Sequence, residues 1–434
     1  MPLTDAVPQT RILMIAYSVH PHKTMEDRNG WHRAIQAARH HCVVVMCSSE
    51  SNLNDLNQSV PETLKERIEF VPIHLGKFGE YCLSTEKLFY VGYRSWLRKA
   101  TQEAIKRHEV KPFSLSHLVS LCGFRETGRL WKLGCPSIIG PIGGTSGFRI
   151  SYLKFVDCYG GMFEILRNAI NGYQTRFSFR VRKAIRNSTV VIAANSSTRD
   201  DLQHYTVQPI RVSLETGIDY PIHLPKTIRE ADKPLQILWT GRLRAWKALP
   251  LLLHAIAKLP VDVQLNLRVV GDGKSEHCWK RVARALKIDQ RIEWIRRPGY
   301  RDSLRYYREA DVFAFTSLRD TSGTGLLEAL TAGTPIIGLN HQGAADIITK
   351  ECGVPISVHN PTQSVNEFRD AIHTLYHDTS RLKLLSDGAL LRAKEFQWSS
   401  YEDPMNAVYQ QVIEHSRNEM SKLTHRLPKL GRQS

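Results

Sequence analysis

No run of apolar residues in the 434-residue sequence approaches the length that a helix needs to span a bilayer, and the opening MPLTDAVPQTR lacks the apolar segment of a signal peptide. The eight cysteines are scattered without a C-x-x-C pair, and no histidine cluster has zinc spacing. These absences argue against a membrane-spanning protein, a disulfide-stapled secreted domain and a zinc module. We therefore expect a cytoplasmic protein whose cysteines are small buried side chains in a reducing compartment.

Acidic residues are also scarce, since 42 Asp and Glu stand against 59 Lys and Arg and leave a formal net charge of +17. Such a surplus favours an anionic partner: nucleic acid, an acidic membrane surface or a phosphorylated substrate. No RNA- or DNA-binding motif is visible, so nucleic acid is the least favoured of the three. The hydrophobic fraction of 42% is ordinary for a globular protein, and the length suits two α/β domains.

The most informative stretch runs from Ala310 to Asp346. It begins with an apolar run, Val312 to Phe315, which predicts a buried strand, and continues through a polar loop into a helical segment at 326–330. Pro335 to Leu339 predicts the next strand. The stretch is therefore a β-α-β unit, and we expect a ligand at the carboxyl ends of its strands.

Two carboxylates and two glycines lie within this unit. Asp320 is on the loop, and Glu328 is eight residues later inside the helix. Gly323 and Gly325 let backbone N–H groups, including that of Thr324, approach a ligand at the helix N-terminus, where an anion is favoured. We predict a phosphate cradle beside two carboxylates that accept hydroxyl hydrogen bonds, as a nucleotide-sugar requires. The alternative is an ordinary Rossmann-like unit with a solvated aspartate.

The same stretch resembles the acidic motif of retaining GT-B glycosyltransferases, in the glycosyl transferases group 1 family that contains bacterial glycogen synthase and sucrose synthase. The family pattern is E-x7-E, an alanine-rich helix, G-x-P and G-x-x-E. Here it reads Asp320-x7-Glu328, then Gly333-Thr334-Pro335 and Gly343-Ala344-Ala345-Asp346. Aspartate replaces the first and the last glutamate, so the identity of the donor sugar stays open.

A second motif follows the strand predicted at Leu235 to Trp239. The sequence TGRLRAWK from Thr240 is similar to the family's G-R-L-x-x-x-K, with Gly241, Arg242 and Lys247 at the matching positions. A guanidinium and an ammonium on one loop would stabilise the charge that grows on the β-phosphate as a nucleoside diphosphate departs, without a metal. Further along, Gly271 belongs to a V-G-x-G match, and we expect its loop to pass near the nucleotide.

The first half of the chain supplies candidates for the acceptor side. A strand at Ile12 to Ala16 precedes a helix from about Gly30 to His40. Gly30 at the start of that helix is either a phosphate contact or a simple helix start.

A glycine-rich segment, Gly140-Pro141-Ile142-Gly143-Gly144, resembles one branch of the family, in which a histidine-bearing strand precedes G-P-I-G-G. The resemblance makes Gly143, Gly144 and His117 acceptor-side candidates. His117 either faces the reaction centre or is a structural histidine. The histidine that many family members carry at the end of the next strand is replaced here by part of Gly140-Pro141.

Two basic segments are amphipathic. Lys87 to Lys111 carries apolar residues at helical spacing and an aromatic cluster near one end, so it either lies in the headgroup region of an anionic bilayer or packs its aromatic face on the sheet. Met162 to Asn187 is similar, with six basic residues against Glu164 alone. The residues behind the first pattern are Tyr93, Leu97, Ala100 and Ala104, with aromatic Phe89, Tyr90 and Trp96.

The resemblance implies an α/β protein of GT-B fold, in which two Rossmann-like domains face each other across a cleft and a C-terminal helix crosses back to the first. We assign 1–220 to the acceptor-side domain, 221–395 to the nucleotide-sugar-binding domain, 396–415 to the crossing helix and 416–434 to a mobile basic tail. It further implies a metal-independent, cofactor-free, retaining transfer of a sugar to a glycan or lipid-linked acceptor, with the enzyme in the cytoplasm or peripheral on the inner leaflet. Arg242, Lys247, Asp320 and Glu328 would carry the reaction.

Three other interpretations stay open. A nucleotide-sugar epimerase of the same fold needs acid and base carboxylates near the anomeric centre, which we do not identify. A glucan phosphorylase would hold a lysine-bound pyridoxal phosphate. A non-enzymatic basic protein that binds membrane or nucleic acid on a Rossmann scaffold would lose affinity steeply with salt and would not depend on Glu328.

Overall fold

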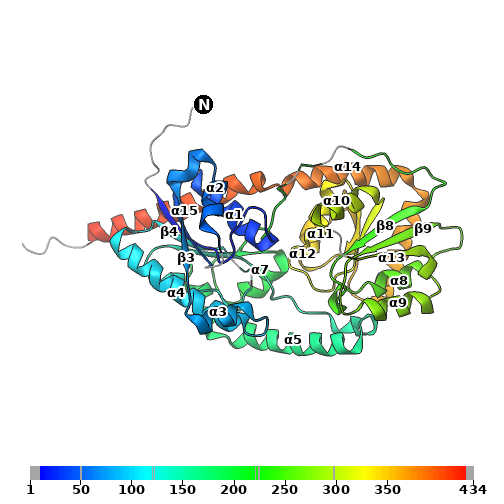
Figure 1. The fold of residues 1–434 in the computed structure, drawn as a ribbon, viewed down its shortest axis with the longest axis horizontal. Helices are drawn as coiled ribbons and strands as arrows, with labels where there is room; N and C mark the ends of the chain where they lie inside the picture. Colours follow the sequence, from blue (N-terminus) through cyan, green and yellow to red (C-terminus); the bar gives the residue numbers. More distant parts are fainter. Residues whose placement is uncertain are drawn as a thin grey trace, which may run out of the picture.

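The computed structural model describes residues 10–426, except 49–50, 120, 122, 220, 223–224 and 297–298. Two parallel sheets, each with its own helices, form two domains that lie side by side along the long axis of the molecule (Figure 1). Every recorded strand pair is parallel, and the central strands Arg11–Ile15, Cys42–Ser48 and Val312–Phe315 are near-continuous apolar runs, as expected for strands covered on both faces. No helix of the described part is long and apolar enough to cross a membrane.

The first sheet has the strand order β3-β2-β1-β4-β5-β6-β7, so the order reverses between β1 and β4. The second sheet has the order β10-β9-β8-β11-β12-β13 and reverses between β8 and β11. In open parallel sheets, this reversal leaves a crevice at the carboxyl ends of the two strands where ligands bind. The strands of the first sheet are β1 Arg11–Ile15, β2 Cys42–Ser48, β3 Ile68–Ile73, β4 Leu115–Leu118, β5 Ser137–Ile142, β6 Val190–Ala193 and β7 Arg211–Val212. Those of the second are β8 Leu235–Thr240, β9 Leu265–Val270, β10 Ile292–Ile295, β11 Val312–Phe315, β12 Ile336–Leu339 and β13 Gly353–Ile356.

The helices alternate with the strands in both halves. The first half contains α1 Met25–Ala38, α2 Leu53–Ser59, α3 Lys77–Ser84, α4 Phe89–Val110, α5 Cys158–Phe177, α6 Phe179–Asn187 and α7 Ser196–Gln203. The second half contains α8 Pro250–Ile256, α9 Glu276–Ala285, α10 Tyr300–Glu309, α11 Thr324–Thr331, α12 Gln342–Ile347, α13 Pro361–His377, α14 Thr379–Glu395 and α15 Trp398–Arg426. Short 3-10 turns are η1 Glu62–Arg67, η2 Leu130–Leu133, η3 Ile150–Phe155, η4 Ala245–Lys247 and η5 Asp289–Arg291.

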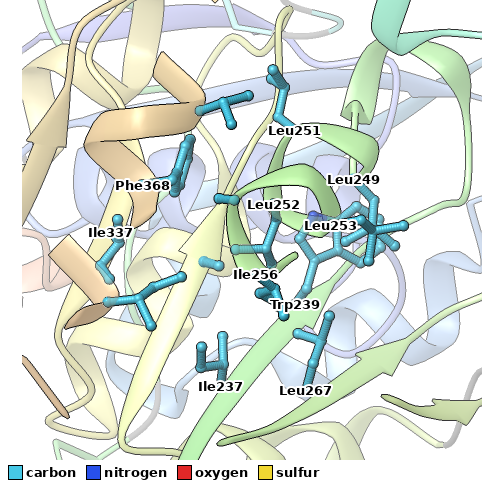
Figure 2. Close-up of a cluster of buried hydrophobic side chains, with 14 of the residues drawn as sticks. Ile237, Trp239, Leu249, Leu251, Leu252, Leu253, Ile256, Leu267, Ile337 and Phe368 are labelled. Atoms are coloured by element: carbon cyan, nitrogen blue, oxygen red, sulfur yellow. The ribbon is translucent and has the colours of Figure 1, made fainter. Parts of the chain in front are cut away.

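The core of the second domain lies between β8 and the helices α8 and α13. Ile237 and Trp239 of β8 are buried with Leu252 of α8 and Phe368 of α13 (Figure 2). The indole Nε1 of Trp239 donates to the hydroxyl of Thr316 at 2.9 Å, which satisfies the one polar atom of that side chain. This packing fixes the carboxyl end of β8, from which the candidate site begins.

Helix α1 begins at Met25, five residues before the predicted start at Gly30. Thr24 and Asp27 form a capping box, which is the local signal that starts the helix. Gly30 lies in the helix interior, where a Cβ would come within 2.2 Å of the carbonyl oxygen of Ser18. The prediction that Gly30 opens a helix is therefore wrong, and the glycine is needed for close packing on the loop after β1.

Helix α4 follows the predicted amphipathic segment, but its aromatic face is not free to meet a bilayer. Tyr93 and Trp96 are buried, and both pack edge-on against Tyr17, with ring centroids 5.5 and 5.0 Å away. Of the two interpretations, packing on the sheet is the one that the structure shows for these side chains.

Helix α15 crosses back to the first domain, where the hydroxyl of its Tyr409 meets His117. The last strand of the first sheet ends at Val212, and the first strand of the second sheet begins at Leu235. The predicted domain boundary at 220 lies between them. The predicted boundary at 416 falls inside α15, which continues to Arg426. The rest of the predicted tail, residues 427–434, lies outside the described residues.

Candidate functional site

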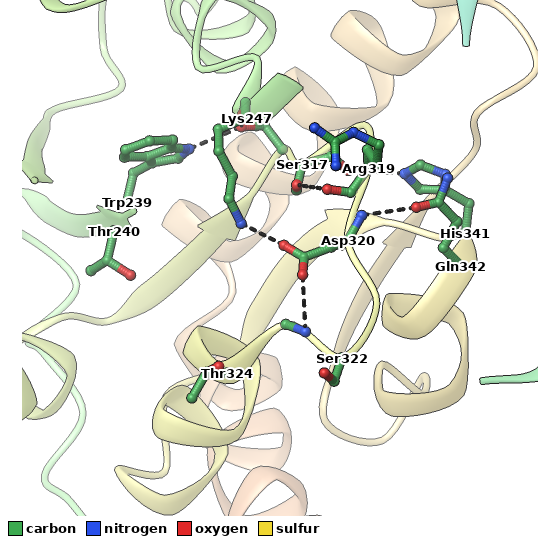
Figure 3. Close-up of polar contacts among 12 residues, drawn as sticks. Trp239, Thr240, Lys247, Ser317, Arg319, Asp320, Ser322, Thr324, His341 and Gln342 are labelled. Atoms are coloured by element: carbon green, nitrogen blue, oxygen red, sulfur yellow. Dashed lines mark hydrogen bonds and ion pairs between the residues drawn. The ribbon is translucent and has the colours of Figure 1, made fainter. Parts of the chain in front are cut away.

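The loops that leave β8 and β11 meet at the point where the strand order of the second sheet reverses. Lys247, in the 3-10 turn after β8, extends its ammonium group to the carboxylate of Asp320, on the loop after β11 (Figure 3). The second oxygen of Asp320 accepts the backbone N–H of Gly323 at 3.2 Å. The structure thus brings together two residues from the two motifs of the sequence.

Asp320 is held in its ionised form. Burial alone would raise the pKa of this carboxyl, but the ion pair with Lys247 and the hydrogen bond from Gly323 outweigh it, so the pKa lies below the ordinary value. A carboxylate with a lowered pKa is ionised at neutral pH, so it can accept hydrogen bonds from hydroxyl groups.

Helix α11 points its N-terminus into the same place. Gly323 precedes it with a left-handed φ of 56°, a conformation that a glycine adopts without strain, and Thr324 is its first residue. The first N–H groups of a helix have no acceptor within the helix, and the helix dipole is positive at this end. Lys247 and this helix end therefore place positive charge and free N–H donors beside Asp320, an arrangement that suits a diphosphate.

Glu328 lies one turn further along α11. Burial raises the pKa of its carboxyl to about 7, although a hydrogen bond with Tyr307 and the charge of Arg28 act in the opposite direction. The Tyr307 hydroxyl also lies 2.5 Å from the hydroxyl of Thr240 at the end of β8. Sequence reasoning missed Tyr307, because nothing in the pattern of α10 separates it from the neighbouring Tyr306.

The glycines of the β8 and β9 loops have a structural role. Gly271 has a φ of 149°, and a Cβ there would lie 1.9 Å from the carbonyl oxygen of Gly241. The glycine of this loop therefore allows close packing of one loop on the other, and the expected passage of the loop near a nucleotide stays a prediction. Arg242, on the packed loop, is exposed, and among the described residues no carboxylate forms an ion pair with it.

The acidic loop is also held from the first domain. The side-chain amide of Asn195, just before α7, donates to the carbonyl oxygen of Thr321 at 2.8 Å, and the backbone N–H of Ser196 donates to Asp346 at 2.6 Å. Asn195 simultaneously caps α7. No pattern in the sequence indicates the contact of Asn195 with Thr321 across the cleft.

An ion pair on the other side of the loop makes a second connection. Nε and Nη2 of Arg319 each donate to one oxygen of Glu164 on α5 at 3.0 Å, and the Glu164 side chain is completely buried. The loop that carries Asp320 is therefore fixed by both domains. In the sequence, Glu164 was notable only as the single acidic residue of the basic segment from Met162 to Asn187.

A pocket opens between the domains beside Asp320. Gly144 and Asn29 line it from the first domain and Thr321 from the second, together with Glu26 and Glu215. Of the predicted acceptor-side residues, only Gly144 reaches this pocket. Gly143 instead accepts the backbone N–H of Phe124 at 3.0 Å and holds the neighbouring loop.

His117 is a structural residue. Its side chain is completely buried, with Nδ1 2.8 Å from the hydroxyl of Tyr409 and Nε2 2.9 Å from the carbonyl oxygen of Gly140. Burial lowers the pKa of the imidazole to about 3, so it stays neutral. Both ring nitrogens are occupied, so the prediction that His117 faces the reaction centre is wrong. In the described part of the chain, no three His, Cys, Asp or Glu side chains gather as metal ligands would.

Comparison with known proteins bears on the second domain most strongly. Residues 223–387 match the model of the family described as glycosyl transferases group 1. A curated D-inositol 3-phosphate glycosyltransferase of Corynebacterium efficiens is 26% identical over 243 residues, which cover 51% of this chain and 56% of the relative. The chain thus spans about half the length of the curated relatives it matches.

Solved structures resemble the whole fold. The Anabaena protein Alr3699/HepE, crystallised with UDP and glucose, covers 93% of this chain with a TM-score of 0.55 and 15% identity over its own full length. The lipopolysaccharide outer core galactosyltransferase WaaB also covers 93%, and all of its own chain, with a TM-score of 0.59 and 13% identity. At these identities, the likeness shows a shared two-domain architecture.

Proposed function

We propose that the chain, which has the GT-B fold and whose residues 223–387 match the glycosyl transferases group 1 model, transfers a sugar from a nucleoside diphosphate sugar to a glycan or lipid-linked acceptor, with retention of the anomeric configuration. The observation that carries the proposal is the meeting of Lys247, Asp320 and the N-terminus of α11 at the β8/β11 switch point.

The diphosphate would lie between this helix end and the loop after β8. An ammonium group has three donors, so Lys247 can keep its bond to Asp320 and still contact phosphate oxygens. Arg242, exposed on the same loop, would add a guanidinium to the β-phosphate. The backbone N–H groups at Gly323, Thr324 and Gly325 would complete the cradle. The UDP present in the Alr3699/HepE crystals supports a nucleoside diphosphate as the ligand class.

The two carboxylates would hold the rest of the donor. Asp320, ionised beside Lys247, would accept hydroxyl hydrogen bonds from the sugar and orient its anomeric carbon. Glu328, further along α11, would accept hydrogen bonds from the ribose. The Thr240–Tyr307–Glu328 chain of hydroxyl contacts fixes its position. These roles assign one carboxyl group to each half of the donor.

In the transfer, the bond between the anomeric carbon and the β-phosphate oxygen breaks, and the acceptor oxygen bonds to the same face of that carbon. The acceptor proton passes to an oxygen of the leaving diphosphate. Lys247 and Arg242 stabilise the charge that the diphosphate gains, which makes a metal ion or cofactor unnecessary in this scheme.

The acceptor would enter from the interdomain pocket lined by Gly144 and Thr321. Arg125, Arg167 and Arg319 stand near the single carboxylate Glu164, and burial followed by the charge of Arg319 lowers the pKa of Arg167 to about 10. These arginines are not among the residues that line the pocket, whose charged members are Glu26 and Glu215, so they do not assign a charge to the acceptor. The names of the relatives, a D-inositol 3-phosphate glycosyltransferase and a lipopolysaccharide outer core galactosyltransferase, support a phosphorylated or lipid-linked acceptor.

The proposal is tested by incubating the protein in EDTA with UDP-, GDP- and ADP-sugars and measuring nucleoside diphosphate release with candidate acceptors. One donor should be consumed, NMR should show the product with the donor's anomeric configuration, and Asp320→Asn should lose the activity that the surface control Asp370→Asn retains. An inverted product would contradict retention, and loss of activity in EDTA would contradict metal independence. A donor converted to its epimer without transfer would favour an epimerase, and pyridoxal absorbance with sugar phosphate formation from glucan would favour a phosphorylase.

A further inference from the structure

Helix α5 has its apolar face toward solvent, the reverse of the orientation usual for a surface helix. Its apolar side chains recur at helical spacing, but they face away from the molecule, whereas its polar side chains face inward. Six large apolar residues that form a stripe along it are 44% to 67% exposed: Met162, Phe163, Leu166, Ile170, Tyr173 and Phe177. On the opposite face, Glu164 is completely buried and Asn171 is 3% exposed. An exposed apolar stripe of this length marks a surface that another phase or partner covers.

The polar face of α5 is held against the protein by specific hydrogen bonds and an ion pair, so the helix cannot turn about its axis to bury its apolar face. Glu164 forms the two-bond ion pair with Arg319. Asn171 and Gln174 both accept hydrogen bonds from Arg125, the latter at 2.6 Å. The helix is thus fixed with its apolar stripe outward. Figure 1 shows α5 along the lower edge of the molecule, beneath both domains.

The charge around the stripe indicates what covers it. Arg176, Arg180, Lys183 and Arg186 are exposed near the C-terminal end of α5 and on α6. From Cys158 to Asn187, the sequence contains six basic residues and one acidic residue, the buried Glu164.

A basic pocket adjoins the same end. Seven of its thirteen lining residues are lysine or arginine, and Glu126 is its only carboxylate. That carboxylate already pairs with Arg94 at 2.5 Å and with Arg180 at 3.5 Å. The exposed Phe179 lines the pocket too, so an apolar surface and an anion-binding pocket are contiguous here.

We propose that the α5 stripe and the adjoining basic pocket dock the protein on an anionic lipid bilayer. An apolar helix face flanked by arginine and lysine is the pattern of helices that lie in the interface plane, with the apolar face in the acyl boundary and the cations among the headgroups. A second copy of the chain fits this surface less well, because it would bring two basic surfaces together. The docking is independent of the proposed transfer reaction, although it would place the interdomain cleft beside the membrane.

Vesicle flotation of the full chain tests the docking without any measurement of turnover. The wild type should float with vesicles of phosphatidylcholine and phosphatidylglycerol and remain behind with phosphatidylcholine alone. The variant Leu166→Asp should reduce flotation roughly tenfold or more, because a charge replaces a side chain that enters the apolar layer. Leu384→Asp, on α14 of the other domain, changes a leucine that is 72% exposed, against 59% for Leu166, and should float like the wild type.

A tryptophan probe provides a second readout if Leu166→Asp does not fold. Tyr173→Trp should shift its fluorescence to the blue when anionic vesicles are added, and Leu391→Trp on α14 should not. No flotation of the wild type with anionic vesicles, or equal flotation of Leu166→Asp and Leu384→Asp, would overturn the proposal. So would a dimer in solution that Leu166→Asp dissociates while neither protein binds vesicles, since the stripe would then belong to a second copy.

Discussion

The ammonium group of Lys247 and the carboxylate of Asp320, 73 positions apart in the sequence, form an ion pair at the carboxyl ends of neighbouring strands β8 and β11. The pair joins the loop that would hold the diphosphate to the loop that would hold the sugar. The pair also lies beside the N-terminus of α11. A cation, a carboxylate and the positive end of a helix dipole are therefore close together at this site.

The two members of this pair should fail in different ways when changed. Lys247→Ala should weaken nucleoside diphosphate binding by roughly a hundredfold or more, because it removes a charge-assisted contact to phosphate. Asp320→Asn should retain nucleotide binding within a few-fold but lose transfer, because the sugar is no longer oriented. Calorimetric titration with the nucleotide, together with turnover of the nucleotide sugar, separates the two outcomes. Equal loss of nucleotide binding in both variants would show that Asp320 serves only to position Lys247.

Glu328 should make stability depend on pH. The folded-state pKa of about 7 exceeds the ordinary value of 4.5, so between these values the folded protein holds a proton that the unfolded chain releases. The contribution of this group is fully present below about pH 4.5, falls as the pH rises, and is lost above pH 7. At about 1.4 kcal/mol per pKa unit, the loss is at most about 3 kcal/mol.

The variant Glu328→Gln removes this proton linkage. Its free energy of unfolding relative to the wild type should rise between pH 5 and pH 8, as measured by urea denaturation at both values. Glu109→Gln, on the exposed end of α4, controls for a general effect of removing a negative charge. A wild-type and variant difference that is the same at both pH values would show that the carboxyl of Glu328 is not perturbed.

Two glycine substitutions should have opposite effects on stability. Gly271→Ala places a Cβ 1.9 Å from the carbonyl oxygen of Gly241 at a positive φ, so it should destabilise the fold by about 2 kcal/mol or more. Gly172→Ala lies inside α5 with no atom within 4 Å of the added carbon, and it should stabilise by about 0.5–1 kcal/mol. The midpoints of urea denaturation of the two variants, compared with that of the wild type, test both predictions. A harmless Gly271→Ala would mean that the two loops are not packed as described.

Substitutions of His117 and Tyr409 should have coupled effects on the free energy of unfolding and no effect on turnover. Each single variant, His117→Ala and Tyr409→Phe, removes a buried hydrogen-bonding group and should cost about 1–3 kcal/mol. The double variant should cost less than the sum of the two, with a coupling of about 0.5–3 kcal/mol. Urea denaturation of the wild type, the two single variants and the double variant measures the coupling free energy. If His117→Ala instead abolished turnover at unchanged stability, the acceptor-side role would have to be restored to this histidine.

The strands were predictable because parallel strands covered on both faces are continuous apolar runs. Val312–Phe315 has the predicted bounds, and β8 extends one residue beyond its prediction. The Lys247 and Asp320 neighbourhood was likewise predictable, since both motifs follow strands that a Rossmann-like order makes adjacent. The roles assigned to these residues stay predictions.

The contacts between the domains were not predictable, because no local pattern encodes them. Nothing in the sequence pairs Glu164 with Arg319 across 155 positions, or Asn195 with the carbonyl of Thr321. The orientation of α5 was hidden for a related reason. Periodicity reveals that a helix has an apolar face, and only tertiary contacts decide that this face is the outer one.

The central claim is that the β8/β11 site binds a nucleoside diphosphate, and thermal unfolding in the presence of UDP, GDP and ADP tests it most directly. A ligand that binds only the folded state, at about a hundred times its Kd, stabilises it by roughly 2.7 kcal/mol. One of the three nucleotides should raise the midpoint of the wild type and of the surface control Arg281→Ala, and should raise it much less in Arg242→Ala and Lys247→Ala. If none of the nucleotides raises the wild-type midpoint, or if the site variants respond like the control, the site does not bind a nucleoside diphosphate and the account of this protein is wrong.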